Sequence, residues 1–126
     1  MASAIVSVDD TLINGMVTRM ITPATFLGFH TITLYETGGT SVDSTTIDQS
    51  DWDAVANGAT ALTSPILFTV NGSSGTPVTI SSIKLFNNLA GLLATITVTE
   101  EVYSVVGTYT LADLTFSLAP ATGIIV

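Results

Sequence analysis

The chain has 126 residues, of which 47% are hydrophobic and only 10% are charged, with ten carboxylates against one arginine and one lysine. A soluble monomer usually carries about 25% charged residues, so this composition indicates that part of the surface is covered by copies of the chain or by a larger assembly. The formal net charge of −8 excludes a surface built to bind nucleic acid, which needs clustered Lys and Arg, and an anionic membrane would repel the chain as well.

The chain has no cysteine, which excludes disulfides and thiolate metal sites. The first residues lack a basic segment followed by a long apolar one, so no signal peptide is expected. Residues 89–94, the longest apolar stretch, are far too few to span a bilayer. The length predicts one domain, in which an N-terminal arm and helix at 1–24 precede a β-sandwich at 25–118 and a C-terminal arm at 119–126.

The N-terminal part of the chain contains the one helix that the pattern predicts. Residues 3–8 fit a short strand or an ordered arm. Asp9 or Asp10 can then serve as the N-cap of the helix, and Pro23 ends it. Helical spacing predicts a buried face that comprises Leu12, Ile13, Met16, Met20 and Ile21. Gly15 weakens this helix by about 1 kcal/mol relative to Ala, so we expect packing to stabilise it.

From residue 25 onward the pattern favours strands, with β-forming residues at 26–35, 66–70, 78–85, 93–98 and 109–118. Residues 42–56 fit either a strand or a short helix capped by Ser50 or Asp51. The alternation of apolar residues slips between Ser81 and Ser82, which predicts a β-bulge, and it slips again around Asp113. Six to eight short strands predict a mainly β domain, a β-sandwich or jelly-roll-like fold with one short N-terminal helix.

The single histidine limits the catalytic possibilities. A Ser-His-Asp site has to use His30, and the strand pattern places that residue on the same face as Ile32 and Leu34, which favours a structural role over a catalytic base. The sequence contains neither a nucleophile elbow nor a phosphate-binding glycine loop. We therefore expect no catalytic residue, no cofactor and no enzyme activity.

A local run of carboxylates is the best candidate for a metal site, and it comprises Asp43, Asp48, Asp51 and Asp53. Calcium prefers such hard oxygen ligands. The spacing matches no EF-hand, however, and Trp52 interrupts the run with a side chain that favours burial. Solvated loop carboxylates are therefore the preferred interpretation, and we expect no metal.

Two other groups of residues are candidates, for an acid/base pair and for a sugar-binding surface. Glu100 and Glu101 are adjacent on a predicted strand and point to opposite faces, so they are not expected to work as an acid/base pair. The remaining candidates are the aromatic residues Tyr35, Trp52, Tyr103 and Tyr109. They are too scattered in the sequence to predict a sugar-binding platform, and we expect them to be buried or interfacial anchors.

The order of the predicted segments along the chain is similar to that in a group of known proteins. The amphipathic helix is followed by residues 27–39, 52–60, 65–70 and 78–83, and residues 107–118 close the predicted sandwich. This order resembles a broad group of small virion proteins of tailed bacteriophages, which includes tail-fibre, minor structural and capsid decoration proteins. The chain departs from the group in its loop at 37–50 and in the start of its final strand, which lacks Gly-Asp.

The resemblance implies a virion structural protein that is made in the host cytoplasm. A compact domain without a coiled coil favours a capsid decoration (cement) protein, for which the group implies a homotrimer in contact with the major capsid protein or other virion proteins. The alternative is a tail-associated fibre tip, baseplate or adaptor subunit, whose receptor contacts would come from residues 37–53 and 71–77. Two further hypotheses are a carbohydrate-binding or calcium-dependent module that uses the four aspartates, and an enzyme that works through His30.

Overall fold

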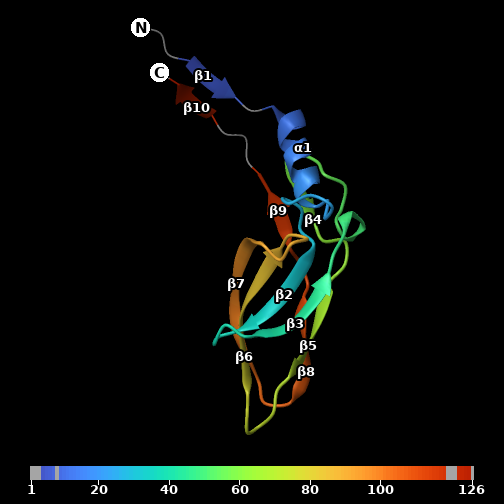
Figure 1. Cartoon of the computed structure of the whole chain (residues 1–126), viewed down its shortest axis with the longest axis vertical. Coiled ribbons are helices and arrows are strands. Elements are labelled where there is room, and N and C mark those ends of the chain that lie inside the picture. Colours follow the sequence, from blue (N-terminus) through green and yellow to red (C-terminus); the bar gives the residue numbers. More distant parts are fainter. Residues whose placement is uncertain (1–3, 8, 119–121, 126) are drawn as a thin grey trace.

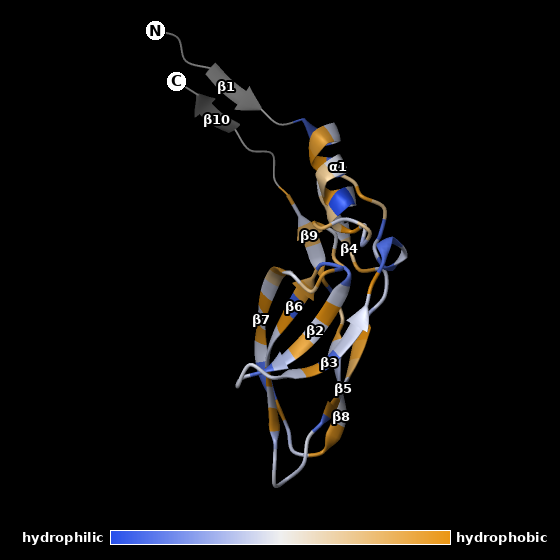
Figure 2. Ribbon diagram, in the orientation of Figure 1, coloured by the Kyte–Doolittle hydropathy of each residue, from blue (hydrophilic) through white to orange (hydrophobic). Residues whose placement is uncertain are grey.

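The computed structural model describes the backbone of residues 4–7, 9–118 and 122–125, with the side chains of residues 9–118 (Figure 1). Among the described residues, strands predominate and the helices are one α-helix and one short 3-10 helix, which confirms the mainly β class predicted from the sequence. Hydrophobic and hydrophilic residues alternate along the strands, as Figure 2 shows for β6 and β7. This alternation is expected for strands with one face toward a core and the other toward solvent.

The helix α1 spans Asp10–Met20, with Asp9 as its N-cap and Ile21 as its C-cap, close to the predicted bounds. Its buried face was predicted correctly at Ile13 and Ile21, which are buried, but incorrectly at two positions: Leu12 and Met16 are 57% and 47% exposed. Val17, which was not predicted, is fully buried. The turn that precedes β4 (Ala59–Ala61) explains the difference: Asn14 Oδ1 accepts a hydrogen bond from the Gly58 amide at 2.6 Å. This contact orients the helix so that Ile13 and Val17 face the body.

The largest sheet has four antiparallel strands in the order β3-β2-β6-β7. Their bounds are Ser41–Thr46 for β3, Thr31–Glu36 for β2, Val78–Phe86 for β6 and Leu92–Tyr103 for β7. The register of β6 against β7 shifts between Ile80 and Ser82, which confirms the predicted bulge. The strand predicted over 26–35 begins only at Thr31, because residues 22–29 form turns, with Phe29 N donating to Met20 O at 2.7 Å.

Two smaller antiparallel pairs complete the body. β5 (Ile66–Asn71) pairs with β8 (Val106–Leu111), and β4 pairs with β9 (Thr115–Ser117). The break between β8 and β9 lies where the sequence pattern slips around Asp113. Between β3 and β4 lies a short 3-10 helix, η1 (Gln49–Asp51), which is capped by Asp48 rather than by the predicted Ser50 or Asp51.

The core lies between the four-stranded sheet and the β5–β8 pair, in a sandwich-like arrangement (Figure 1). Ile32, Leu34, Ile80 and Ile83 from the sheet are fully buried, as are Phe68 and Val70 from the facing pair. Near α1 the aromatic ring of Phe29 lies 5.9 Å from Trp52 and 5.2 Å from Phe116, between ring centroids. Such aromatic contacts add to the stabilisation that burial provides.

The first and last described strands form a ribbon of their own. β1 (Ala4–Ser7) pairs antiparallel with β10 (Thr122–Ile125), in a register that places Ala4 opposite Ile125. Figure 1 shows this ribbon leading away from the body at the α1 end. The strand predicted at 3–8 is thus present over residues 4–7.

Candidate functional site

The outer face of the four-stranded sheet carries a groove, which we call the outer-sheet groove. Because side chains alternate along β2, Ile32 and Leu34 face the core while Thr31, Thr33 and Tyr35 face outward. Residues of β3, of the end of β6 and of the turn that follows β6 complete its lining, and they are Ser41, Ser44, Phe86, Asn87, Asn88 and Ala90, with His30 before β2. The groove therefore combines the neighbouring segments 30–35 and 41–44 with residues 86–90, which are distant from them in the sequence.

Hydroxyl groups form the floor of the outer-sheet groove. Thr33 points outward, yet it is only 5% exposed, because the surrounding side chains cover it. Its Oγ1 lies 2.9 Å from Ser44 Oγ, and either hydroxyl can be the donor. The pairing of β2 with β3, which places Thr33 opposite Ser44, produces this contact. A row of hydroxyls that can both donate and accept hydrogen bonds lies at the base of the groove.

Two aromatic rings line the groove above this floor. The centroids of Tyr35 and Phe86 lie 6.4 Å apart at an interplanar angle of 43°. Lys84, the only lysine of the chain, has its Nζ 4.5 Å from the centroid of the Tyr35 ring, within the distance at which a cation is attracted to an aromatic face. The lysine thus holds a positive charge beside this aromatic wall.

The turn after β6 forms one end of the groove and is held by Asn87. The Asn87 Oδ1 accepts hydrogen bonds from the Leu89 and Gly91 amides at 2.9 and 2.7 Å, and its Nδ2 donates to the Phe26 carbonyl at 3.0 Å. Ala90, in the same turn, has a φ of 61°, a left-handed conformation that costs a non-glycine residue about 1 kcal/mol. Asn87 therefore fixes the position of a strained turn at the rim of the groove.

His30 lies at the same end of the groove. Its Nδ1 is 3.0 Å from Thr31 Oγ1, its amide donates to the Phe86 carbonyl, and its carbonyl accepts from the Ile47 amide. The sequence pattern placed His30 on the core face with Ile32 and Leu34, and this was incorrect. The alternation does not extend back to residue 30, because β2 starts at Thr31.

The four aspartates of the predicted carboxylate run do not converge. Asp43 accepts hydrogen bonds from the Ser44 and Thr69 amides at 2.8 and 2.7 Å. Asp48 and Asp51 form the capping box of η1, while Asp53 accepts from the Thr63 hydroxyl at 3.0 Å. In the described part of the chain, no group of three or more His, Cys, Asp or Glu side chains could hold a metal ion.

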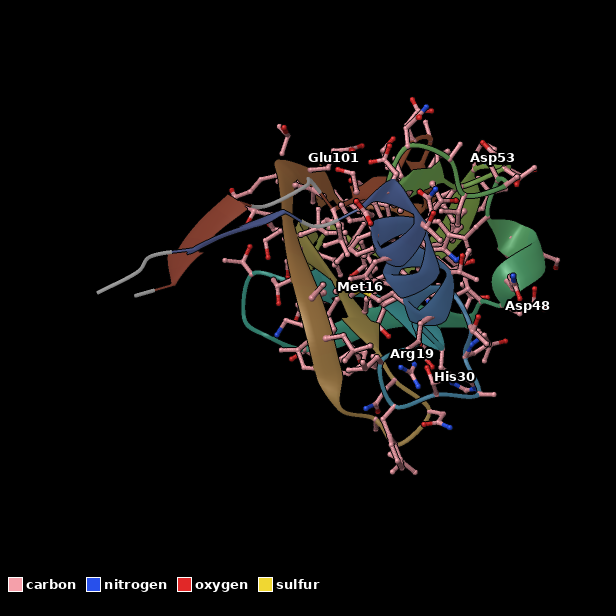
Figure 3. All side chains as sticks on the ribbon, turned by 90° about the horizontal axis from the view of Figure 1, so that it is seen from above. Met16, Arg19, His30, Asp48, Asp53 and Glu101 are labelled. Carbon is pink, nitrogen blue, oxygen red and sulfur yellow. The ribbon has the colours of Figure 1, made fainter. Side chains whose placement is uncertain are left out.

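The local role of Asp48 is also visible in its acidity. Hydrogen bonds from the hydroxyl and the amide of Ser50 lower the pKa of the Asp48 carboxyl group. Figure 3 shows Asp48 and Asp53 on the η1 side of the molecule, away from Glu101 on the β7 side. The carboxylates of 43–53 therefore hold loops in place and, through Asp43 and the Thr69 amide, join β3 to β5.

The glutamates are exposed, whereas the other aromatic residues contribute to packing. Glu100 and Glu101 are both exposed on β7. The Tyr103 hydroxyl lies 3.2 Å from both Glu101 Oε1 and the Thr108 carbonyl oxygen. Partial burial first, and then the negative charge of Glu101, raise the pKa of Tyr103 and of Tyr109. Trp52 and Tyr109 are buried, at 5% and 8% exposed, as expected for anchors.

Most of the outer-sheet groove was not predictable from the sequence. Tyr35 and Phe86 meet because β2 and β6 pair antiparallel, with Thr31 opposite Phe86. The outward series Thr31, Thr33 and Tyr35 was visible as an alternation, and it was the one signal that a polar face with an aromatic residue exists there. The pairing partner that supplies Phe86 and Lys84 was not predictable from that alternation.

Comparison with known proteins found no family model that matches the chain, and no curated protein or solved structure that matches it. In the described residues, no helix is long and apolar enough to cross a membrane.

Proposed function

We propose that the protein is a structural subunit of a tailed-bacteriophage virion, most simply a capsid decoration (cement) protein without catalytic activity. In this role it binds other subunits of the particle, copies of itself in a homotrimer and the major capsid protein. Its contribution is mechanical, because each contact across a junction of the shell has to be broken before the shell can open.

The observation that carries the proposal is the β1–β10 ribbon. Among the described residues, each of these two strands pairs only with the other, and Figure 1 places the ribbon outside the sandwich-like body. A two-stranded ribbon is at best marginally stable in water by itself. Both of its outer edges offer unpaired backbone groups, which favours contact with a neighbouring subunit.

The exposed side of α1 supports the same interpretation. Leu12 and Met16 lie four residues apart, which places them on one face of the helix, and they are 57% and 47% exposed. The ribbon leaves the body at this end of the molecule (Figure 1). A partner that binds the ribbon can therefore also cover this apolar face, and exposed patches of this kind mark interaction sites.

The proposal is tested by the copy number of the protein in virions. Particles of the phage that encodes the chain are purified, and the protein is quantified against the major shell protein by mass spectrometry. Abundance comparable with that of the shell protein supports the decoration role. Absence from purified particles contradicts the virion assignment altogether.

A tail-associated role is the second candidate, and the outer-sheet groove is the observation that favours it. A fibre tip or baseplate subunit needs a surface that contacts a receptor, and Ser41 and Ser44 from the 37–53 segment line the groove. The same copy-number measurement separates the two roles, because a tail subunit is present in only a handful of copies per particle.

A further inference from the structure

We propose that the outer-sheet groove binds carbohydrate, with the aromatic wall of Tyr35 and Phe86 against the apolar face of a sugar ring and the exposed serine hydroxyls of β3 against the sugar hydroxyls. This inference depends on the groove alone, and it holds whether or not the chain is a virion subunit.

The aromatic wall supplies the apolar contact. One face of a pyranose ring presents mostly C–H groups, and such groups pack favourably on the electron-rich face of an aromatic ring. Tyr35 and Phe86 are both only partly buried and both line the groove. Their ring centroids lie 6.4 Å apart and their planes meet at 43°, so the two rings form a bent apolar wall, and a sugar ring can pack against one of them.

The polar lining suits the other part of a sugar. The exposed hydroxyls of Ser41 and Ser44, the amide of Asn88 and the imidazole of His30 can each donate or accept a hydrogen bond. A sugar hydroxyl also does both, so a lining of this kind matches it without a fixed charge. Binding sites commonly combine an apolar wall with a few convergent polar groups.

The distribution of charge also favours this ligand class over a cation or a basic peptide. The chain has ten carboxylates, yet none is among the described residues that line the groove. His30 lines it, and the Lys84 ammonium lies beside the Tyr35 ring. In a chain of net charge −8, this absence of acidic groups makes the groove suitable for a neutral or an acidic sugar.

The test applies the purified full-length chain to immobilised neutral oligosaccharides of hexose and N-acetylhexosamine, and to acidic oligosaccharides that contain uronic acid. Binding is then measured in solution by calorimetry. The expected result is saturable binding of at least one oligosaccharide. If added salt and Lys84→Gln both weaken binding, the ligand is acidic. If neither changes the affinity, the ligand is neutral.

Two variants locate the site. Ser44→Phe fills the groove from an exposed position of β3, and Thr97→Phe places the same ring on the outer face of β7, outside the groove. Ser44→Phe weakens binding by about tenfold or more, and Thr97→Phe leaves it unchanged. Tyr35→Ala gives the same loss, and thermal melts confirm that each variant is folded.

Three results would overturn the proposal. The first is no saturable binding of any oligosaccharide by the unmodified chain. The second is binding that Ser44→Phe and Tyr35→Ala leave intact, which places the sugar elsewhere. The third is dissociation of an oligomer by Ser44→Phe, measured by sedimentation, when no oligosaccharide binds. In that case the groove is a contact between copies of the chain.

Discussion

Two glycines differ in the space that a methyl group would find. A Cβ on Gly15, which is exposed in the middle of α1, has no other atom within 4 Å. A Cβ on Gly72 lies 2.1 Å from the Tyr103 carbonyl oxygen, which is backbone and cannot move aside easily. The two positions therefore give opposite expectations for the same substitution.

Gly15→Ala is expected to raise the free energy of unfolding by about 0.5–1 kcal/mol, because alanine has the better helix propensity and restricts the unfolded chain. Gly72→Ala is expected to lower it, because the backbone has to shift. Trp52 is the only tryptophan and is buried, so its fluorescence follows urea unfolding of both variants. A loss of stability in Gly15→Ala contradicts the helix geometry.

Tyr103 and Tyr109 make the stability depend on alkaline pH. Burial and then Glu101 raise the pKa of both phenols in the folded state, so the folded chain holds these protons more tightly than the unfolded chain does. Their contribution is fully present below the unfolded pKa of about 10, and it is lost as pH rises through the higher folded pKa.

Glu101→Gln removes the negative charge that contributes to both of these shifts. It is expected to lower the pKa of Tyr103 and Tyr109, measured from the tyrosinate absorbance in a pH titration, and to reduce the loss of stability above about pH 10. Glu100→Gln, at the neighbouring exposed position of β7, is the control. Equal effects of the two variants would show that net charge, and not the Glu101 contact, raises these pKa values.

At the scale of elements, Asp43 joins two strands that no backbone ladder connects. β3 ends one sheet, β5 belongs to another, and Asp43 Oδ2 accepts the Thr69 amide proton at 2.7 Å across the seam. Asp43→Ala leaves that amide without this acceptor and is expected to lower the free energy of unfolding by about 1–2 kcal/mol. Asp113→Ala, at an exposed position in the connection between β8 and β9, is expected to change it little.

The effect of calcium on the melting temperature distinguishes this contact between β3 and β5 from a metal site. If the Asp43 carboxylate serves only as a hydrogen-bond acceptor, neither calcium nor a chelator changes the melting temperature of the unmodified chain. A ligand that binds only the folded state raises the melting temperature, so a rise with calcium that Asp43→Ala abolishes would contradict the seam assignment.

The features predictable from the sequence were the local ones. The bounds of α1 follow from Asp9 and Pro23, and the bulge in β6 follows from the slip between Ser81 and Ser82, because each depends on neighbouring residues. The buried face of α1 depends on a contact with Gly58, 44 positions from Asn14. Similarly, the groove depends on the strand register that places Thr33 opposite Ser44 and Lys84, which periodicity does not reveal.

At the scale of the whole molecule, the body and the ribbon are separable in their hydrogen bonding. The last backbone bond that ties the described body together near its C-terminal end joins the Leu118 amide to the Gly58 carbonyl at 2.8 Å. The ribbon strands lie beyond it at 4–7 and 122–125. Removal of residues 1–8 and 119–126 therefore leaves every strand pairing of the body in place.

This truncated chain is expected to unfold in urea at nearly the midpoint of the full chain, because the core and the strand pairings of the body, which set the free energy of unfolding and its slope, are retained. Its self-association, measured by sedimentation, and its incorporation into particles are expected to be lost, since the exposed edges of the ribbon are the contacts proposed for assembly. The double variant Leu12→Ser and Met16→Ser keeps the ribbon and weakens the same association by removing the exposed apolar face of α1. If the truncated chain still assembles while this double variant does not, α1 and not the ribbon is the assembly contact.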